Sequence, residues 1–170
     1  MALTRHSRAG RHSENITSRG ESRTPHFGLM DSEALGPERA ALQRARLHLR
    51  GGRRRLRQGK TSAGVVAIYD ALTSAMEWFC ASPDRRSRMR SAPEAFPDDR
   101  SLYAALVSAG ILNGDFDFDL FNLIVDRALV SEIASDDASG ILGGVESVFT
   151  QLGVLPFDDE ELPPEDPNTF

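Results

Sequence analysis

Arginines recur along one side of a predicted helix in the first half of the chain. From Glu38 to Lys60 there are nine basic residues and one acid. At 100° per residue, a subset projects within a sector of roughly 60°; its members are Arg39, Arg46, Arg50, Arg53 and Arg57. Planar guanidinium groups bind phosphates and carboxylates through paired hydrogen bonds, and like charges four residues apart repel each other mildly. The spacing therefore indicates a surface for a polyanion or an acidic partner, with Arg46, Arg50, Arg53 and Arg57 as candidate binding residues.

A second basic cluster follows in a proline-rich segment. Residues 83–98 contain three prolines and the closely spaced arginines Arg85, Arg86, Arg88 and Arg90. A loop of this length in a compact domain is usually either mobile or functional. We therefore predict that these four arginines are further candidates for polyanion or partner binding.

The charge of the chain is divided along its length. Residues 1–100 have 19 basic and 11 acidic residues, whereas residues 101–170 have one arginine and 14 acids. Such asymmetry points to partners rather than to a reaction. Three interpretations stay open for the arginines. They pair with acids of the same chain or of another copy, they bind nucleic acid, or they contact an anionic membrane surface.

The motifs that could carry catalysis are incomplete. Gly59-Lys60-Thr61 resembles the end of a phosphate-binding loop, but the required first glycine is replaced by Arg54. His48 has no acidic residue three or four positions away. The single cysteine, Cys80, excludes an internal disulfide and a zinc site built on several thiolates. We predict no catalytic residue, no metal ligand and no cofactor.

Three aspartates alternate with two phenylalanines before a predicted helix. Asp115, Asp117 and Asp119 do not fit an EF-hand, because leucine and aspartate occupy the positions of its glycine and its final glutamate. Carboxylates at the start of a helix accept hydrogen bonds from its free N–H groups and oppose its dipole. We expect these aspartates to cap the helix while Phe116 and Phe118 anchor it in the core.

Apolar residues recur with helical spacing, and no strand-type alternation is present. The predicted helices cover residues 37–58, 62–81, 99–109, 117–134 and 137–152. The short connection Gly59–Thr61 joins the first two as an antiparallel hairpin. Gly51-Gly52 indicates either a break in the first helix or close approach of another helix. The fold class is therefore all-α, a bundle of four to five helices.

Both ends of the chain differ in composition from this bundle. Residues 1–36 form a predicted disordered leader, and a start at Met30 would leave residues 1–29 outside the native protein. Residues 37–155 form the helical domain, with the proline- and arginine-rich loop at 83–98. Residues 156–170 are predicted to be an acidic disordered tail. No apolar run is long enough for a membrane span, and we expect a cytoplasmic protein.

The hairpin over residues 38–81 resembles the HEPN class of small helical domains, which also pair an arginine-bearing helix with one bearing alanine and tyrosine. Ribonucleases of that class carry Arg, four residues and His. Here the matching position before His48 is Gln43, with Arg44 one position too close. The leading hypothesis is a non-enzymatic interaction or oligomerisation module with a protein partner or a second copy. The alternatives are a nucleic-acid-associated protein and a HEPN-like toxin–antitoxin or RNase-related protein.

Overall fold

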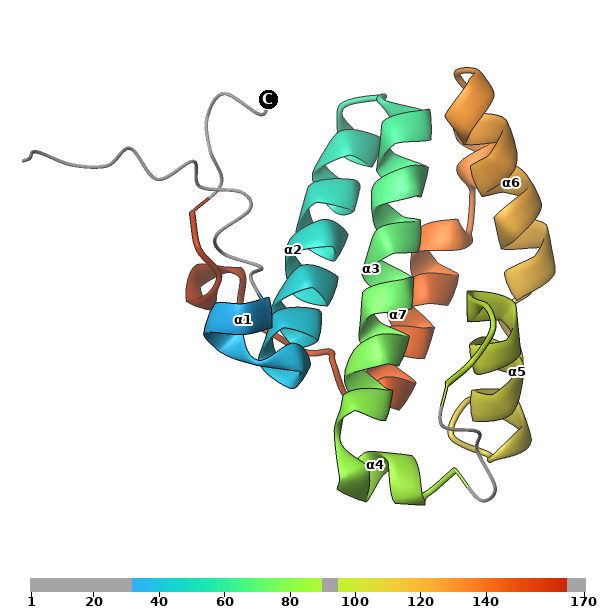
Figure 1. Ribbon diagram of the computed structural model, residues 1–170. Coiled ribbons are helices and arrows are strands. Elements are labelled where there is room, and N and C mark those ends of the chain that lie inside the picture. The colour runs from blue at the N-terminus through green and yellow to red at the C-terminus, as the bar shows by residue number, and fades with distance from the viewer. Residues whose placement is uncertain (1–31, 90–94, 165–170) are drawn as a thin grey trace, which may run out of the picture.

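The computed structural model describes residues 32–89 and 95–164, and these residues fold as an all-α structure without strands (Figure 1). The predicted fold class is confirmed. The elements are α1 (Ser32–Leu35), α2 (Pro37–Arg57), α3 (Thr61–Ala81), α4 (Pro83–Ser87), α5 (Asp99–Ser108), α6 (Phe118–Val130), η2 (Ser135–Ala138), α7 (Ile141–Leu152) and η3 (Asp159–Glu161).

The α2–α3 hairpin is the base on which the other helices pack. Helix α2 runs through Gly51 and Gly52 without a break, and both glycines are buried. A Cβ atom at position 52 would lie 2.6 Å from Cγ1 of Ile68 and 3.2 Å from the carbonyl oxygen of Gly64. Gly52 therefore allows close approach of α3. Of the two predictions for Gly51-Gly52, close approach of another helix is confirmed and a break in the helix is wrong.

Helix α3 lies at the centre of the bundle, with α2 on one side and α5, α6 and α7 around the rest (Figure 1). Its residues Leu72, Met76 and Phe79 are almost completely buried, as are Phe121 of α6 and Phe149 of α7. A helix that is apolar around most of its circumference is expected at such a position. The sequence predicted this central helix correctly.

Helix α6 ends before its predicted end at residue 134 because the residues after it make tertiary hydrogen bonds, and α7 begins after its predicted start at residue 137 because Ser135–Ala138 form the 3₁₀ helix η2. The Ser62 hydroxyl donates to the carbonyl oxygen of Ser131 at 2.9 Å and accepts from the backbone N–H of Ile133 at 2.9 Å. A side-chain oxygen of Glu132 accepts from the backbone N–H of Ser62. These hydrogen bonds provide an acceptor for the backbone N–H of Ser62 at the start of α3, and they hold residues 131–133 in a non-helical conformation.

Three predicted irregular segments contain ordered structure. Ser32–Leu35, expected in the leader, form α1. Pro83–Ser87, expected in the long loop, form α4, in which proline occupies a favoured first position. Residues 156–164, expected in a disordered tail, include η3 and a buried Leu162. Residues 1–31 and 165–170, which complete the predicted leader and tail, lie outside the described residues.

Candidate interaction surfaces

The predicted arginine stripe lies on α2, and its middle part is covered by the C-terminal half of the chain. We call Arg46, Arg50 and Arg53 the arginine surface. Nε of Arg53 donates to Oε1 of Glu146 in α7 at 2.7 Å. Arg50 donates through Nη2 to the carbonyl oxygen of Pro163 at 2.7 Å, and through Nη1 to that of Asp159 at 3.4 Å. Arginines and C-terminal residues therefore meet within one molecule.

An aromatic side chain completes this cover. The Phe157 ring lies 5.3 Å from the Arg46 guanidinium carbon and 5.9 Å from that of Arg53. Both distances fit attraction between a cation and the face of a ring. Arg57, the fourth candidate on α2, is exposed to solvent. The structure thus separates Arg57 from the three covered arginines.

The second basic cluster is at the other end of α2. Arg85 in α4 donates to Oε1 of Glu38 at 2.7 Å and to the carbonyl oxygen of Trp78 at 2.8 Å. Its guanidinium carbon also lies 3.9 Å from the centre of the Trp78 ring. Because Glu38 and Arg46 are eight residues apart, these contacts are about 12 Å along the helix axis from the arginine surface. Arg85 therefore links α4 to Glu38 of α2 and Trp78 of α3.

Two further arginines of that cluster, Arg86 and Arg88, have other surroundings than the arginine surface. Arg86 is half-buried, and Arg88 is exposed with its guanidinium carbon 5.6 Å from the centre of the Phe79 ring. Arg90 lies outside the described residues. In the part of the chain that the structure describes, the two predicted arginine clusters therefore do not form one site.

Helix α6 carries an apolar surface that sequence reasoning missed. Among the described residues, the exposed large hydrophobic side chains are Leu120 at 53%, Leu123 at 62%, Leu129 at 64% and Val130 at 84%. We call these four the α6 apolar surface. Leu120 is exposed, whereas its helix neighbours Phe121 and Ile124 are buried in the core. The available signal was that apolar residues occur around nearly the whole helix, more than one buried face needs.

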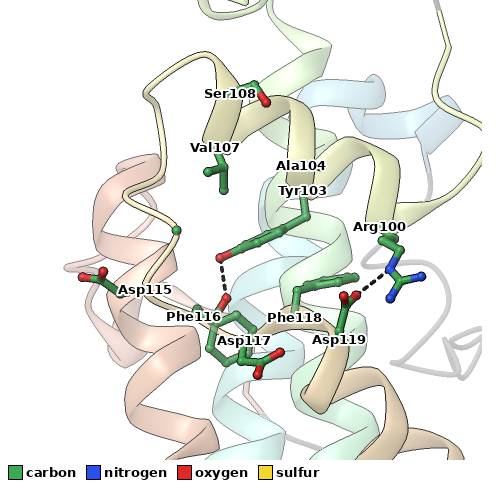
Figure 2. A pocket seen from close by; sticks show the side chains of 11 residues that line it. Arg100, Tyr103, Ala104, Val107, Ser108, Asp115, Phe116, Asp117, Phe118 and Asp119 are labelled. Carbon is green, nitrogen blue, oxygen red and sulfur yellow. Dashed lines mark hydrogen bonds and ion pairs between the residues drawn. The ribbon is translucent and has the colours of Figure 1, made fainter.

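A pocket of about 650 Å³ adjoins the N-terminal end of α6 (Figure 2). Tyr103 and Phe118 stack at 4.8 Å between ring centres, and the Tyr103 hydroxyl donates to the carbonyl oxygen of Phe116 at 2.8 Å. Burial raises the pKa of Tyr103, with nearby Asp115 and Asp117 adding to the shift. The pocket therefore has aromatic walls and acidic edges.

The three aspartates of the sequence motif lie at the edge of this pocket. Oδ1 of Asp117 accepts from the backbone N–H of Leu120 at 2.9 Å, so the predicted capping role is confirmed for Asp117. Asp119 forms an exposed ion pair with Arg100, whose hydrogen bond lowers the pKa of Asp119. Asp115 is bonded to Asn113 within the same loop. Capping and local pairing account for much of this acidic motif.

The remaining chemical candidates are His48 and Cys80. Nδ1 of His48 lies 4.0 Å from Oδ2 of Asp70, and both side chains are partly exposed. Cys80 is half-buried beside Met89, and burial raises the pKa of its thiol. Within residues 32–89 and 95–164, no group of three or more His, Cys, Asp or Glu side chains is placed to hold a metal ion.

Comparison of the chain with family models, with curated proteins and with solved structures gives no match. None of the described helices combines the length and the apolar character that crossing a membrane requires.

Proposed function

We propose that the protein is a non-enzymatic helical module that binds a protein partner through α6. The observation that supports this function is the gathering of four exposed, large apolar side chains on one helix. Each buried side chain of this size contributes roughly 1.5–3 kcal/mol relative to its exposed state. Leu120, Leu123 and Val130 project within a sector of roughly 80°, with Leu129 farther round the helix. Exposed apolar side chains gathered in this way are typical of interaction surfaces.

The charges beside this surface select the kind of partner. Asp119, Leu123, Asp126 and Val130 follow one another at spacings of four, three and four residues, so they form one row along α6. The row begins at the edge of the acidic pocket, because Asp119 also lines that pocket. Asp119 is paired with Arg100 of the same chain, so a partner that covers the row is expected to bring positive charge beside Asp126.

The proposed occupant is an amphipathic helix of another protein, with an apolar face flanked by Lys or Arg. A groove or exposed helix face is commonly recognised by a helix with anchors at i, i+3, i+4 and i+7. A second copy of the chain is less suitable, because residues 101–170 have 14 acids and one arginine. Two such surfaces facing each other would bring like charges together.

A model peptide tests this proposal without knowledge of the natural partner. A fluorescent helical peptide with leucines on one face and flanking lysines is titrated with the full chain, and its anisotropy is measured. We expect binding that weakens at least about tenfold in the Leu120→Ser/Leu123→Ser variant, since two apolar anchors are lost. A peptide with glutamates in place of the lysines should not bind.

Two results would overturn the proposal. One is equal peptide affinity for the wild-type chain and for Leu120→Ser/Leu123→Ser. The other is a wild-type dimer in sedimentation equilibrium that becomes a monomer in the same variant, because the occupant would then be a second copy. Arg57→Ala is a suitable control, since Arg57 is exposed on α2, on the other side of α3 from α6 (Figure 1).

A further inference from the structure

The C-terminal segment occupies the arginine surface in the manner of a bound peptide. The chain leaves α7 at Gly153, and Val154 is completely buried. The next residues cross α2, where Phe157 contacts two guanidinium groups and the carbonyl oxygens of Asp159 and Pro163 accept from Arg50. Leu162, 9% exposed, anchors the far end. The segment therefore contacts the arginine surface through the Phe157 ring and two backbone carbonyl oxygens, and Leu162 is buried at its far end.

The acidic side chains of this segment take little part in those contacts. Residues 158–161 are two aspartates and two glutamates, and all four are exposed. Asp158 accepts from the backbone N–H of Glu160, which holds the 3₁₀ turn. The carboxylates therefore remain in water above a row of arginines, where they contribute mainly long-range attraction.

The contacts of the C-terminal segment with Arg46 differ from its contacts with Arg50. Among the described residues, Nε of Arg46 is buried and meets no hydrogen-bond acceptor, and the contact of Arg46 with the segment is the Phe157 ring. Buried donors are normally paired, and leaving one unpaired is unfavourable. The C-terminal segment is therefore an imperfect ligand, and a ligand with an additional acceptor at Arg46 would fit better.

We propose that the arginine surface is a docking site for acidic protein segments that carry an aromatic residue, with residues 156–163 of the same chain as a built-in competitor. This site is separate from the α6 apolar surface and does not depend on it. A tethered segment has an effective concentration on the order of millimolar. An external segment therefore binds only when its affinity and concentration allow it to displace the tethered segment, or when contacts of the tethered segment with the arginines are lost.

The contacts favour a peptide over a nucleic acid. Arg50 donates to the backbone carbonyl oxygens of Asp159 and Pro163, which the 3₁₀ turn between them brings together, an arrangement that another peptide with such a turn reproduces. Glu146 is part of the same surface through its ion pair with Arg53, so the arginines are not a continuous positive track. The chain has a net charge of −5, which also opposes association with a polyphosphate.

The test uses the full chain and a fluorescent peptide with the sequence of residues 153–164. Phe157→Ala in the chain weakens the tethered segment, so we expect the peptide to bind this variant at least about tenfold more tightly than wild type. Adding Arg50→Ala should abolish that gain, whereas adding Arg57→Ala should preserve it. Both changes remove one arginine from α2, so they are matched in charge. A peptide with alanine at its phenylalanine should bind weakly.

A second variant guards against misfolding. If Phe157→Ala lowers the helical circular dichroism, Leu162→Ala replaces it, since Leu162 anchors the segment outside the main core. Equal peptide affinity for wild type and for a folded variant overturns the proposal, as does a gain that survives Arg50→Ala. A labelled oligothymidylate is titrated in parallel. Tighter binding of that probe than of the peptide, lost in Arg50→Ala, would assign the site to nucleic acid and overturn the peptide proposal.

Discussion

The close contact between α2 and α3 at Gly52 predicts that a small increase in size will destabilise the protein. Alanine at position 52 would place its Cβ 2.6 Å from Cγ1 of Ile68 and 3.2 Å from the carbonyl oxygen of Gly64. Ile68 is completely buried, and a backbone oxygen moves only if its helix moves. The two helices must therefore separate slightly along the most extensive contact of the bundle.

The expected size follows from two opposing contributions. Replacing glycine by alanine inside a helix is favourable by about 1 kcal/mol. Overpacking a well-packed core costs about 1–3 kcal/mol, and a rigid backbone neighbour places Gly52 in the upper part of that range. We expect Gly52→Ala to lower the free energy of unfolding by about 1–2 kcal/mol.

Gly143 on α7 is the matched control, because a Cβ there meets nothing within 4 Å and the residue is exposed. Gly143→Ala should raise the free energy of unfolding by up to about 1 kcal/mol. Urea unfolding followed by far-UV circular dichroism measures both variants. Equal stabilisation by the two substitutions would refute close packing at Gly52, since helix propensity would then decide both.

Two other predictions concern the ends of helices. Asp98 caps α5 by accepting from the backbone N–H of Ser101 at 2.7 Å, and this bond lowers the pKa of Asp98. A carboxyl group with a lowered folded-state pKa stabilises the protein above its unfolded-state pKa, and the effect disappears as the pH falls through the folded-state value. Asp98→Asn keeps a capping oxygen but does not titrate, so unfolding stability should fall less steeply below about pH 4 than in wild type; an unchanged slope would contradict this role. Arg85→Ala removes the cation that covers Trp78, the one tryptophan of the chain. Its fluorescence maximum should shift to longer wavelength and the free energy of unfolding should fall by about 1–2 kcal/mol; Arg88→Ala, an exposed neighbour, should leave the emission of Trp78 unchanged.

The helical core was predictable because it depends on local periodicity. Residues Leu72, Met76 and Phe79 recur on one face of a continuous apolar helix, and the turn signals at Gly59 and Pro83 fix its ends to within a residue or two. The end of α6 was not predictable in this way. Residues 131–133 leave the helix because they bond Ser62, about 70 positions earlier in the chain, and no local propensity encodes that contact.

The ordered end of the chain was missed for a related reason. Residues 156–164 are acidic and proline-rich, a composition that is typical of disorder when it is considered alone. Their order comes from Arg50 and from the two guanidinium groups beside Phe157, which are more than 100 positions away. Both partners, the arginine stripe and the acidic end, are recognisable in the sequence, but whether they meet in one molecule is not.

The arrangement of the bundle makes the two proposed surfaces experimentally independent. The arginine surface is on α2, the α6 apolar surface is on α6, and α3 lies between these helices (Figure 1). Substitutions on distant sites that share no contacts usually have additive effects. Arg50→Ala should therefore leave binding of the leucine–lysine peptide unchanged, and Leu120→Ser/Leu123→Ser should leave binding of the 153–164 peptide unchanged. If either variant impaired both peptides, electrostatic attraction or partial unfolding would explain the binding better than two sites, because a local loss of contacts on one helix does not reach the other.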